Sequence, residues 1–360
     1  KNLSFEPKIE GDSLVVQVPA YREDIETYQD IAEEVIRMYG YEHVVPAFMP
    51  SAQVTIGGLS LAQKSELRLK KALCSVGAYE CIHYSFFSPA DLDLLRLPED
   101  AVERKAIRLV NPISEELSLM RTTLAASMIN AVVRNQKKGN LEGRLFEIGN
   151  VFMPYELPLT QYPDEKARLC VGIFGEKESF YTMKGIAEKI ADTLQVSFTY
   201  ENMSNTFLHP YQTAKVLCEG MEIGYFGKLA YDIADECDLR TPMFVMELDL
   251  KLLSQWYGKK PVFTPLPKFP EEQRDLALVV DRSITCGEIE KVMKEACKYI
   301  TKISLFDIYE GEQIAADKKS MAFTVVFTPK DEAFAAESVD GFVKKILKQL
   351  NKAFGVELRS

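Results

Sequence analysis

The stretch DLALVVDRSITCGEIEKVMKEACKYITKISLFDIY, residues 275–309, decides the fold of the C-terminal part of the chain. Apolar residues alternate with other residues over 275–281 and 302–309, which predicts two strands, and helical spacing over 286–298 predicts a helix between them. The following residues continue with a strand at 320–328, a helix at 337–353 and a strand at 355–359. This βαββαβ order predicts a ferredoxin-like domain.

Period-2 alternation gives each strand of this sheet a face towards the helices and an open face. The face towards the helices is predicted to carry Leu276, Leu278, Val280, Phe306, Ile308, Met321, Phe323, Val325 and Phe327. The open face is predicted to carry Ala277, Val279, Asp307, Tyr309, Ser320, Ala322 and Thr324. An open sheet face with a tyrosine can stack nucleic-acid bases, although a plain solvated sheet explains the same pattern.

Two connectors divide the rest of the chain. The stretch GKKPVFTPLPKFPEEQ, residues 258–273, contains Pro261, Pro265, Pro267 and Pro270 and predicts a stiff linker. PAFMPSAQVTIGG, residues 46–58, is a second linker. We therefore expect three domains, at residues 1–50, 58–257 and 268–360.

The middle domain is predicted to be α+β with a largely antiparallel sheet, because its predicted strands outnumber its crossover helices. Its helices are expected near residues 61–73, 122–135 and 181–194, and a strand is expected at 80–87. The first domain is predicted to be a partial α+β unit, with a strand in SLVVQVPAYR followed by an acidic helix.

The composition is typical of a globular protein and argues against a membrane-spanning segment. The chain has 360 residues, 47% of them apolar and 27% charged, and no apolar run approaches the ~20 residues of a membrane span. Its seven cysteines never form C-x-x-C, which favours reduced thiols and a cytoplasmic protein. The first residue is Lys1 rather than Met, so we expect a piece of a longer protein.

Charge argues against a general coat for nucleic acid. The net charge is −10, whereas residues 268–360 hold 15 Lys and Arg against 16 Asp and Glu. The C-terminal domain is therefore the more suitable neighbour of a polyanion. No nucleophile elbow, P-loop, dinucleotide fingerprint or Cys/His metal spacing is present, so the chain is not predicted to be a self-contained enzyme.

The strongest chemical candidate is the acidic stretch YREDIETYQDIAEEVIRMYG, residues 21–40. Asp30, Glu33 and Glu34 are at helical spacings of three and four, and Asp24 lies in the preceding turn. Carboxylate oxygens suit Mg²⁺, which keeps several waters and needs only one or two direct carboxylates. The alternative is a solvated helix face on which Glu33 pairs with Arg37.

Three groups of motifs, in the same order as in the family, resemble the beta subunit of bacterial phenylalanyl-tRNA synthetases over nearly the whole chain. VPAYREDIETYQDIAEEVIRMYGY resembles the end of its B5 domain. NPISEELSLMRTTLAASMINAVVRN with LFEIGNVF resembles its catalytic-like core. KFPEEQRDLALVVDR, LFDIYEGEQI and KKSMAFTVVF resemble its ferredoxin-fold anticodon-binding domain.

The resemblance implies specific sites and partners. Asp24, Asp30, Glu33 and Glu34 match four acids that bind Mg²⁺ at a site shared with the alpha subunit. Anticodon contacts map onto Ala277, Asp307, Tyr309 and Ser320, which strand alternation places on the open face independently. There, Tyr309 would stack on a base, Asp307 and Ser320 would bond base edges, and Ala277 would allow close approach.

The resemblance also implies a class II synthetase-like core without catalytic residues. Motif 3 and its ATP-binding arginine are absent, and Arg144 lies just ahead of the strand on which motif 2 needs its arginine, so adenylate formation lacks its cationic stabilisation. ATP and amino-acid activation would belong to the alpha subunit. Arg121, Asn111 and Glu147 are thus predicted to be structural. The sequence HPYQTA, residues 209–214, departs from the family's HPGRSA, which leaves a role for this predicted loop in doubt.

Three functions remain in competition. The first is a beta-subunit fragment of phenylalanine–tRNA ligase that is inactive alone, assembles with the alpha subunit into an alpha2beta2 heterotetramer, and binds tRNA(Phe) for ATP-dependent attachment of phenylalanine. On this interpretation we expect the fragment to be without the family's upstream domains for tRNA binding and editing. The second is a stand-alone metal-dependent enzyme that uses the Asp24 cluster. The third is a scaffold that binds no RNA.

Overall fold

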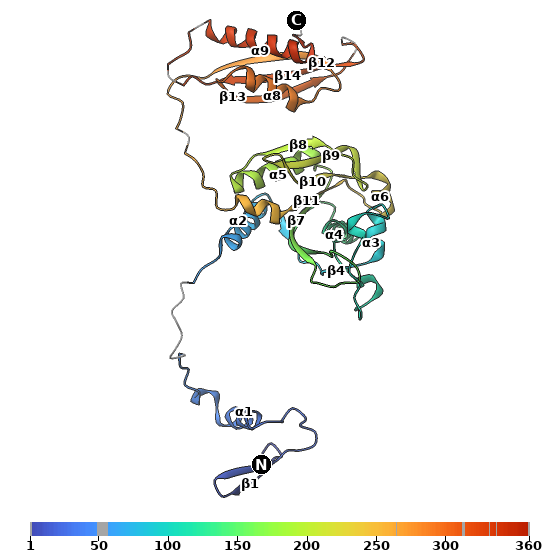
Figure 1. Ribbon diagram of the computed structural model, residues 1–360, viewed down its shortest axis with the longest axis vertical. Helices are drawn as coiled ribbons and strands as arrows, with labels where there is room; N and C mark the ends of the chain where they lie inside the picture. The colour runs from blue at the N-terminus through green and yellow to red at the C-terminus, as the bar shows by residue number, and fades with distance from the viewer. Residues whose placement is uncertain are drawn as a thin grey trace. The chain divides into compact units, whose positions relative to one another are not determined.

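The computed structural model describes residues 2–48, 57–263, 265–311, 314–330, 332–335 and 337–358 (Figure 1). The chain divides into two compact units, Lys1–Gly258 and Lys259–Ser360. Most of the predicted linker 46–58 lies outside the described residues, as does Thr264 of the proline-rich connector. None of the helices in the described parts of the chain is long and apolar enough to cross a membrane.

The first residues form a hairpin followed by a helix. Strands β1 (Glu6–Glu10) and β2 (Ser13–Gln17) pair antiparallel. Helix α1 (Tyr28–Tyr39) and a short 3-10 turn, η1 (Tyr41–His43), follow. The carboxylate of Asp30 begins α1 by accepting bonds from the backbone N–H groups of Glu26 and Thr27 at 3.0 and 2.7 Å. The predicted strand and acidic helix are confirmed.

The middle of the chain is built on a seven-stranded sheet of order β3-β6-β7-β11-β10-β9-β8. Only β3 and β6 run parallel, and the other neighbours are antiparallel. The strands are β3 (Tyr79–Glu80), β6 (Gly143–Met153), β7 (Asp164–Phe174), β8 (Phe198–Asn202), β9 (Leu208–Cys218), β10 (Met221–Leu229) and β11 (Met243–Asp249). The predicted antiparallel α+β core is confirmed.

Helices cover both faces of this sheet. α2 (Leu61–Ser75) and α5 (Phe180–Leu194) share one hydrophobic cluster with it, and α4 (Ala125–Lys137) belongs to a second cluster. Alternation along β7 explains the two clusters, because Val171 faces the first and Cys170 the second. The remaining elements are α3 (Pro89–Leu94), α6 (Tyr231–Glu236), α7 (Leu250–Leu253), η2 (Val102–Arg104), η3 (Glu115–Leu117), η4 (Ser254–Trp256), β4 (Phe86–Phe87) and β5 (Leu119–Met120).

Two expectations for the core were wrong. The predicted strand 80–87 is split, because β3 joins the main sheet whereas β4 pairs separately with β5. Between them the chain leaves the sheet, and Ile82 and Tyr84 are exposed. The stretch 209–214, expected to be a loop, lies within strand β9, where Ala214 pairs with Phe226 of β10.

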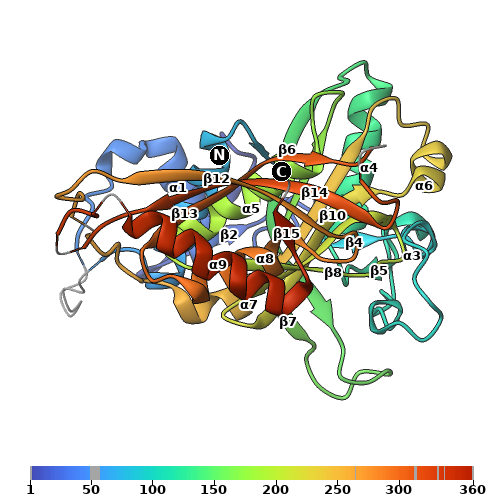
Figure 2. The ribbon, with the colours of Figure 1, turned by 90° about the horizontal axis from the view of Figure 1, so that it is seen from above.

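The C-terminal unit has the predicted βαββαβ order. Its elements are β12 (Glu272–Asp281), α8 (Cys286–Ala296), β13 (Ile300–Tyr309), β14 (Lys318–Phe327), α9 (Ser338–Phe354) and β15 (Glu357–Leu358). The sheet order is β13-β14-β12-β15, with every pair antiparallel. Helices α8 and α9 pack together against this sheet, and Figure 2 shows α9 alongside its strands. The predicted ferredoxin-like domain is confirmed.

The predicted core face of this sheet is confirmed except in β13. Its buried residues include Leu276, Leu278, Val280, Met321, Phe323, Val325 and Phe327. Phe306 and Ile308 were assigned to the same face, yet they are 59% and 47% exposed. A register shift between Leu305 and Asp307 leaves Phe306 as an extra, unpaired residue. Such a bulge interrupts strict alternation, and β13 is moreover an edge strand.

Candidate functional sites

The acidic cluster on α1 is built around arginines. Arg22 bonds both carboxylate oxygens of Asp24, at 2.9 and 2.7 Å, and also Oε1 of Glu34 at 2.7 Å. Arg37 donates to the other oxygen of Glu34 at 2.6 Å. Hydrogen bonds from Arg22 lower the pKa of Asp24 to about 2, and those from Arg22 and Arg37 lower the pKa of Glu34 to about 2. Two guanidinium groups thus hold Glu34, which is only 8% exposed.

These four carboxylates do not fit a magnesium ion as they lie in this chain. Asp24 and Glu34 are occupied by guanidinium groups, and Asp30 accepts three bonds at the start of α1. Glu33 is exposed and makes no ion pair within the described residues. Across the same residues, no group of three or more acidic, His or Cys side chains is arranged to hold a metal.

Because Arg22 and Arg37 both bond Glu34, we expect the stability of the α1 region to depend on pH. Its folded pKa of about 2 lies below the usual 4.5, so its contribution to stability is complete above about pH 4.5 and is lost as the pH falls towards 2. We expect Glu34→Gln to abolish most of this acid sensitivity in the α1 region, measured by circular dichroism melts between pH 6 and 2. Glu33→Gln is the matched control, since the exposed Glu33 lacks these arginine contacts. If the two variants lose stability equally as the pH falls, Arg22 and Arg37 do not stabilise the fold through Glu34.

The core contains a buried ion pair between Arg121, the residue after β5, and Glu147 of β6. Arg121, 3% exposed, donates to Oε1 of Glu147 at 2.7 Å and to the carbonyl of Asn150 at 2.8 Å. Nδ1 of His83 lies 2.6 Å from Oε2 of Glu147 and donates to it, because an ionised carboxylate only accepts. Burial acts to raise the pKa of Glu147, but the His83 and Arg121 hydrogen bonds hold it below its usual value.

This pair belongs to a polar row across the sheet that sequence reasoning missed. Cys170 pairs with both Glu147 and Glu247 across neighbouring strands, and Glu247 pairs with Tyr225. The carboxylate of Glu247 accepts from the hydroxyl of Thr123 at 2.6 Å. The only signal in the sequence was an acid in the middle of each of two apolar strands. Because the chain's own side chains satisfy both acids, the row has the character of a structural network.

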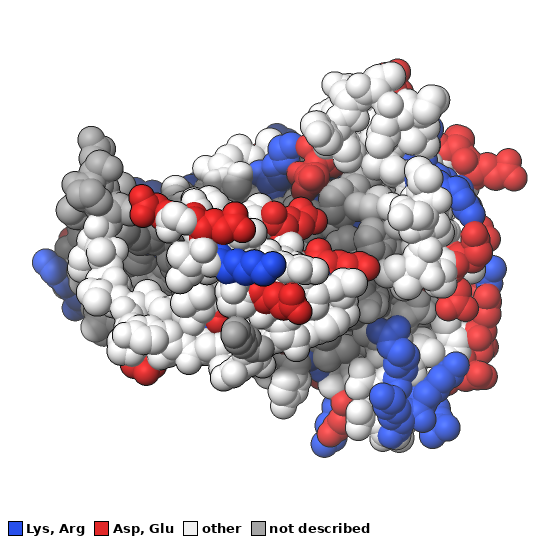
Figure 3. Space-filling model, turned by 90° about the horizontal axis from the view of Figure 1, so that it is seen from below, with Lys and Arg blue, Asp and Glu red and all other residues white. Residues whose placement is uncertain are grey.

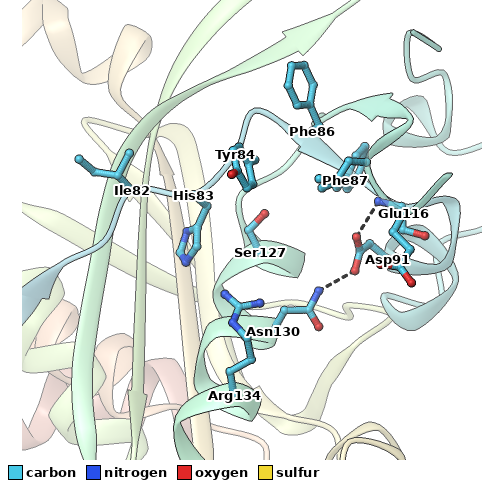
Figure 4. Close-up of a pocket in the computed structure, with 12 residues that line it drawn as sticks. Ile82, His83, Tyr84, Phe86, Phe87, Asp91, Glu116, Ser127, Asn130 and Arg134 are labelled. Carbon is cyan, nitrogen blue, oxygen red and sulfur yellow. Dashed lines mark hydrogen bonds between the residues drawn. The ribbon is translucent and has the colours of Figure 1, made fainter. Parts of the chain in front are cut away.

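A cavity of about 670 Å³ opens beside this row (Figure 4). Ser127, Asn130 and Arg134 project into it from one side of α4, and His83 faces them from the segment after β3, whereas the ring of Phe86 in β4 points away from them. Two acids line the cavity, Asp91 and Glu116. Asp91 is already engaged, because it accepts from the amide of Asn130 at 2.6 Å and from the N–H of Ser88 at 2.7 Å. These contacts supply no nucleophile with an adjacent base.

The open face of the C-terminal sheet brings the four predicted RNA contacts together. Tyr309 of β13 pairs with Ser320 of β14, Asp307 pairs with Ala322, and Ala322 also pairs with Ala277 of β12. Residues paired across an antiparallel ladder share a face. Asp307 is exposed, and Ala277 and Tyr309 are half-buried. Ser320 is only 3% exposed, which leaves its hydroxyl little surface for a base.

Exposed arginines of the C-terminal domain are paired with neighbouring acids. On the one face that Figure 3 shows, several Lys and Arg side chains gather at the lower right, and Asp and Glu lie along the right edge and across the centre. In the C-terminal domain, the exposed Arg282 pairs with Glu310 at 2.9 Å, and Arg274 pairs with Glu272 at 3.1 Å. Binding on this domain would have to depend on a few specific contacts more than on phosphate neutralisation.

Comparison with known families accounts for each part of the chain. Residues 1–41 match the tRNA synthetase B5 domain, residues 45–250 match the phenylalanyl tRNA synthetase beta chain CLM domain, and residues 267–359 match the ferredoxin-fold anticodon binding domain. These domains together define a subunit of an aminoacyl-tRNA synthetase. More particularly, the chain belongs to the phenylalanyl-tRNA synthetase beta chain family.

Curated relatives agree over the whole chain. The phenylalanine–tRNA ligase beta subunits of Clostridium tetani and Carboxydothermus hydrogenoformans are 34% and 33% identical, over 99% and 100% of this chain. The chain covers 45% and 46% of those relatives, about half their length. A pyrrolysyl tRNA synthetase from Desulfitobacterium hafniense is similar in fold, with a TM-score of 0.43, 13% identity and coverage of 63% of this chain and 72% of that one.

Proposed function

We propose that this chain reads the anticodon of tRNA(Phe) with the open face of its C-terminal sheet. The observation that carries the proposal is the grouping of Tyr309, Asp307 and Ala277 on one uncovered sheet face, in a domain that matches the ferredoxin-fold anticodon binding family. Tyr309 stacks on a base, Asp307 accepts a hydrogen bond from a base edge, and the small Ala277 allows close approach. Ser320 lies on the same face but is only 3% exposed, so we propose no base contact for it.

We propose further that residues 1–50, 58–257 and 268–360 are its domains, and that the middle one is a class II synthetase-like core without activity. The support is the polar row, in which Arg121 and His83 neutralise Glu147 and Thr123 bonds Glu247. Groups committed to one another are not available to bind ATP or an aminoacyl adenylate. In this proposal the alpha subunit binds ATP and activates phenylalanine in a cytoplasmic alpha2beta2 enzyme.

The surface of α2 supports assembly with the alpha subunit. Leu61 and Leu67 are 55% and 41% exposed, and Lys64 and Lys71 lie exposed on the same side at spacings of three and four. The other two basic residues of α2 are engaged inside the chain. Arg68 donates to the carbonyl of Thr193 at 3.0 Å, and Lys70 pairs with Glu80 at 2.8 Å.

Two measurements on the same mixture test whether this chain assembles with the alpha subunit and whether it is inactive alone. We expect this chain to form a heteromer with an alpha subunit in light scattering. Amino-acid-dependent pyrophosphate exchange should appear only when the alpha subunit is present. A Leu61→Ser, Leu67→Ser variant should assemble at least tenfold more weakly, whereas Lys177→Ser on an exposed turn should not. Exchange by this chain alone, or species that remain separate, would contradict the proposal.

We propose a magnesium site at Asp24, Asp30, Glu33 and Glu34 only for the two-subunit enzyme, where a partner can draw the arginines away from the carboxylates. This chain alone should bind Mg²⁺ weakly, since Arg22 and Arg37 already compensate Glu34. Calorimetry on the two-subunit enzyme should detect metal binding that Glu33→Ala with Glu34→Ala removes. Unchanged binding by this double variant would exclude the four residues as ligands.

A further inference from the structure

The turn after β13 lies against the phenol ring of Tyr309. A Cβ atom added at Gly311 would lie 2.6 Å from Cζ and 3.1 Å from Cε1 of this ring, and closer still to the hydroxyl oxygen. Real Cβ atoms essentially never approach other heavy atoms within 3.0 Å. The ring can therefore occupy its present place only because residue 311 has no side chain.

Contacts on both sides of Gly311 hold the backbone at this residue. Its carbonyl accepts a hydrogen bond from the N–H of Ile314 at 2.9 Å. Glu310, between Tyr309 and Gly311, is tied by a 2.9 Å ion pair to Arg282, which follows β12. Arg282 in turn accepts a bond at its carbonyl from Nζ of Lys319 at 3.0 Å. The backbone under the ring is thus linked to β14, the neighbour of β13, and to the end of β12, the next strand of the sheet.

We propose that Gly311 is a positioning residue for Tyr309, because a residue without a side chain leaves the phenol ring its place against the backbone at residue 311. This inference rests on the proposed function of the open face. A ring displaced from this place offers a base a different stacking surface, so binding should weaken. A methyl group at residue 311 occupies the space of the phenol end, and the ring must rotate away from it.

The first test needs no RNA. In the full chain labelled with fluorotyrosine, we expect Gly311→Ala to shift the Tyr309 fluorine resonance, assigned by its loss in Tyr309→Phe. Gly287→Ala and Gly341→Ala are matched controls, since a Cβ at either helical glycine meets nothing within 4 Å. They should leave the resonance in place. An unshifted resonance in a folded Gly311→Ala chain would overturn the proposal, whatever the chain binds.

The second test asks whether Gly311 acts through the ring. We expect Gly311→Ala to weaken binding of tRNA(Phe) about threefold to tenfold, less than the loss from Tyr309→Ala. The double variant should bind no more weakly than Tyr309→Ala alone, because the ring that Gly311 positions is gone. Losses that multiply would show an independent effect of the turn and overturn the proposal.

The outcomes separate this inference from the function on which it rests. If Tyr309→Ala weakens binding but Gly311→Ala does not, the open face binds RNA and Gly311 does not position the ring. If neither variant changes binding while Gly311→Ala shifts the fluorine resonance, Gly311 orders the ring but the open face is not the RNA site. Thermal melts of each variant check that the domain remains folded.

Discussion

Tyr309→Ala is expected to raise the KM for tRNA(Phe) of the assembled enzyme by roughly tenfold to a hundredfold. Stacking of a base on an aromatic side chain contributes about 1–3 kcal/mol, and Tyr309 is the aromatic among the four predicted RNA contacts. The chemistry is proposed for the other subunit, so kcat should change much less than KM. The measurement is aminoacylation of tRNA(Phe) with native and altered anticodons, because lost stacking should also reduce discrimination between them.

Two control variants distinguish loss of stacking from a general effect of removing an aromatic ring. Tyr211→Ala removes a tyrosine that is 92% exposed on β9 of the core, and it should leave the KM for tRNA unchanged. Phe323→Ala should mainly unfold the C-terminal domain, because this ring is fully buried and its removal costs about 3–5 kcal/mol. If Tyr309→Ala discriminates between anticodons as well as the unaltered enzyme, the open face is a plain solvated sheet.

The C-terminal fold was predictable because two signals in the sequence agree: the alternation within each strand and the order of strands and helices. Alternation of the kind seen in Leu276, Leu278 and Val280 marks a strand with one buried face, and the order of strands and helices then leaves few topologies. The bulge at Phe306 was not predictable in this way. An inserted residue keeps the same apolar composition but shifts the pairing by one position, and only the partner strand reveals the shift.

The candidate sites were predictable to different extents. Helical spacing correctly placed Glu33, Glu34 and Asp30 on α1, but it did not account for Arg22, which comes from the preceding loop and bonds Asp24 and Glu34. A spacing argument counts only side chains on one element. The same limit hid the link between Glu147 and His83, which are 64 residues apart in the sequence.

Arg121→Met should cause a larger loss of stability than any change to a surface ion pair. Removing Arg121 leaves Glu147 charged and buried, with His83 as its remaining side-chain partner, and also strips a donor from the carbonyl of Asn150. Breaking a buried pair on one side costs about 3–5 kcal/mol. For a core of this size, the midpoint of thermal unfolding should fall by roughly 6–20 °C. Calorimetric melts of the full chain measure this shift.

Arg108→Met is the matched control for the ion pair. Arg108 bonds Glu115 at 2.7 Å, the same distance as in the buried pair, but the two side chains are 57% and 78% exposed. Exposed pairs contribute about 0–1 kcal/mol, so its melting midpoint should hardly move. If Arg108→Met and Arg121→Met lower the midpoint of thermal unfolding equally, water reaches Glu147 and the Arg121–Glu147 pair is not buried.

A second substitution separates a structural role from a catalytic one. Adding Glu147→Gln to Arg121→Met removes the stranded charge, so part of the lost stability should return, because a neutral amide is less costly to bury than an unpaired carboxylate. If Arg121 only holds the core together, both variants should activate phenylalanine with normal kcat below their melting temperatures once joined to the alpha subunit. A collapse of kcat in a folded Arg121→Met enzyme would instead place Arg121 in the chemistry and contradict the inactive core.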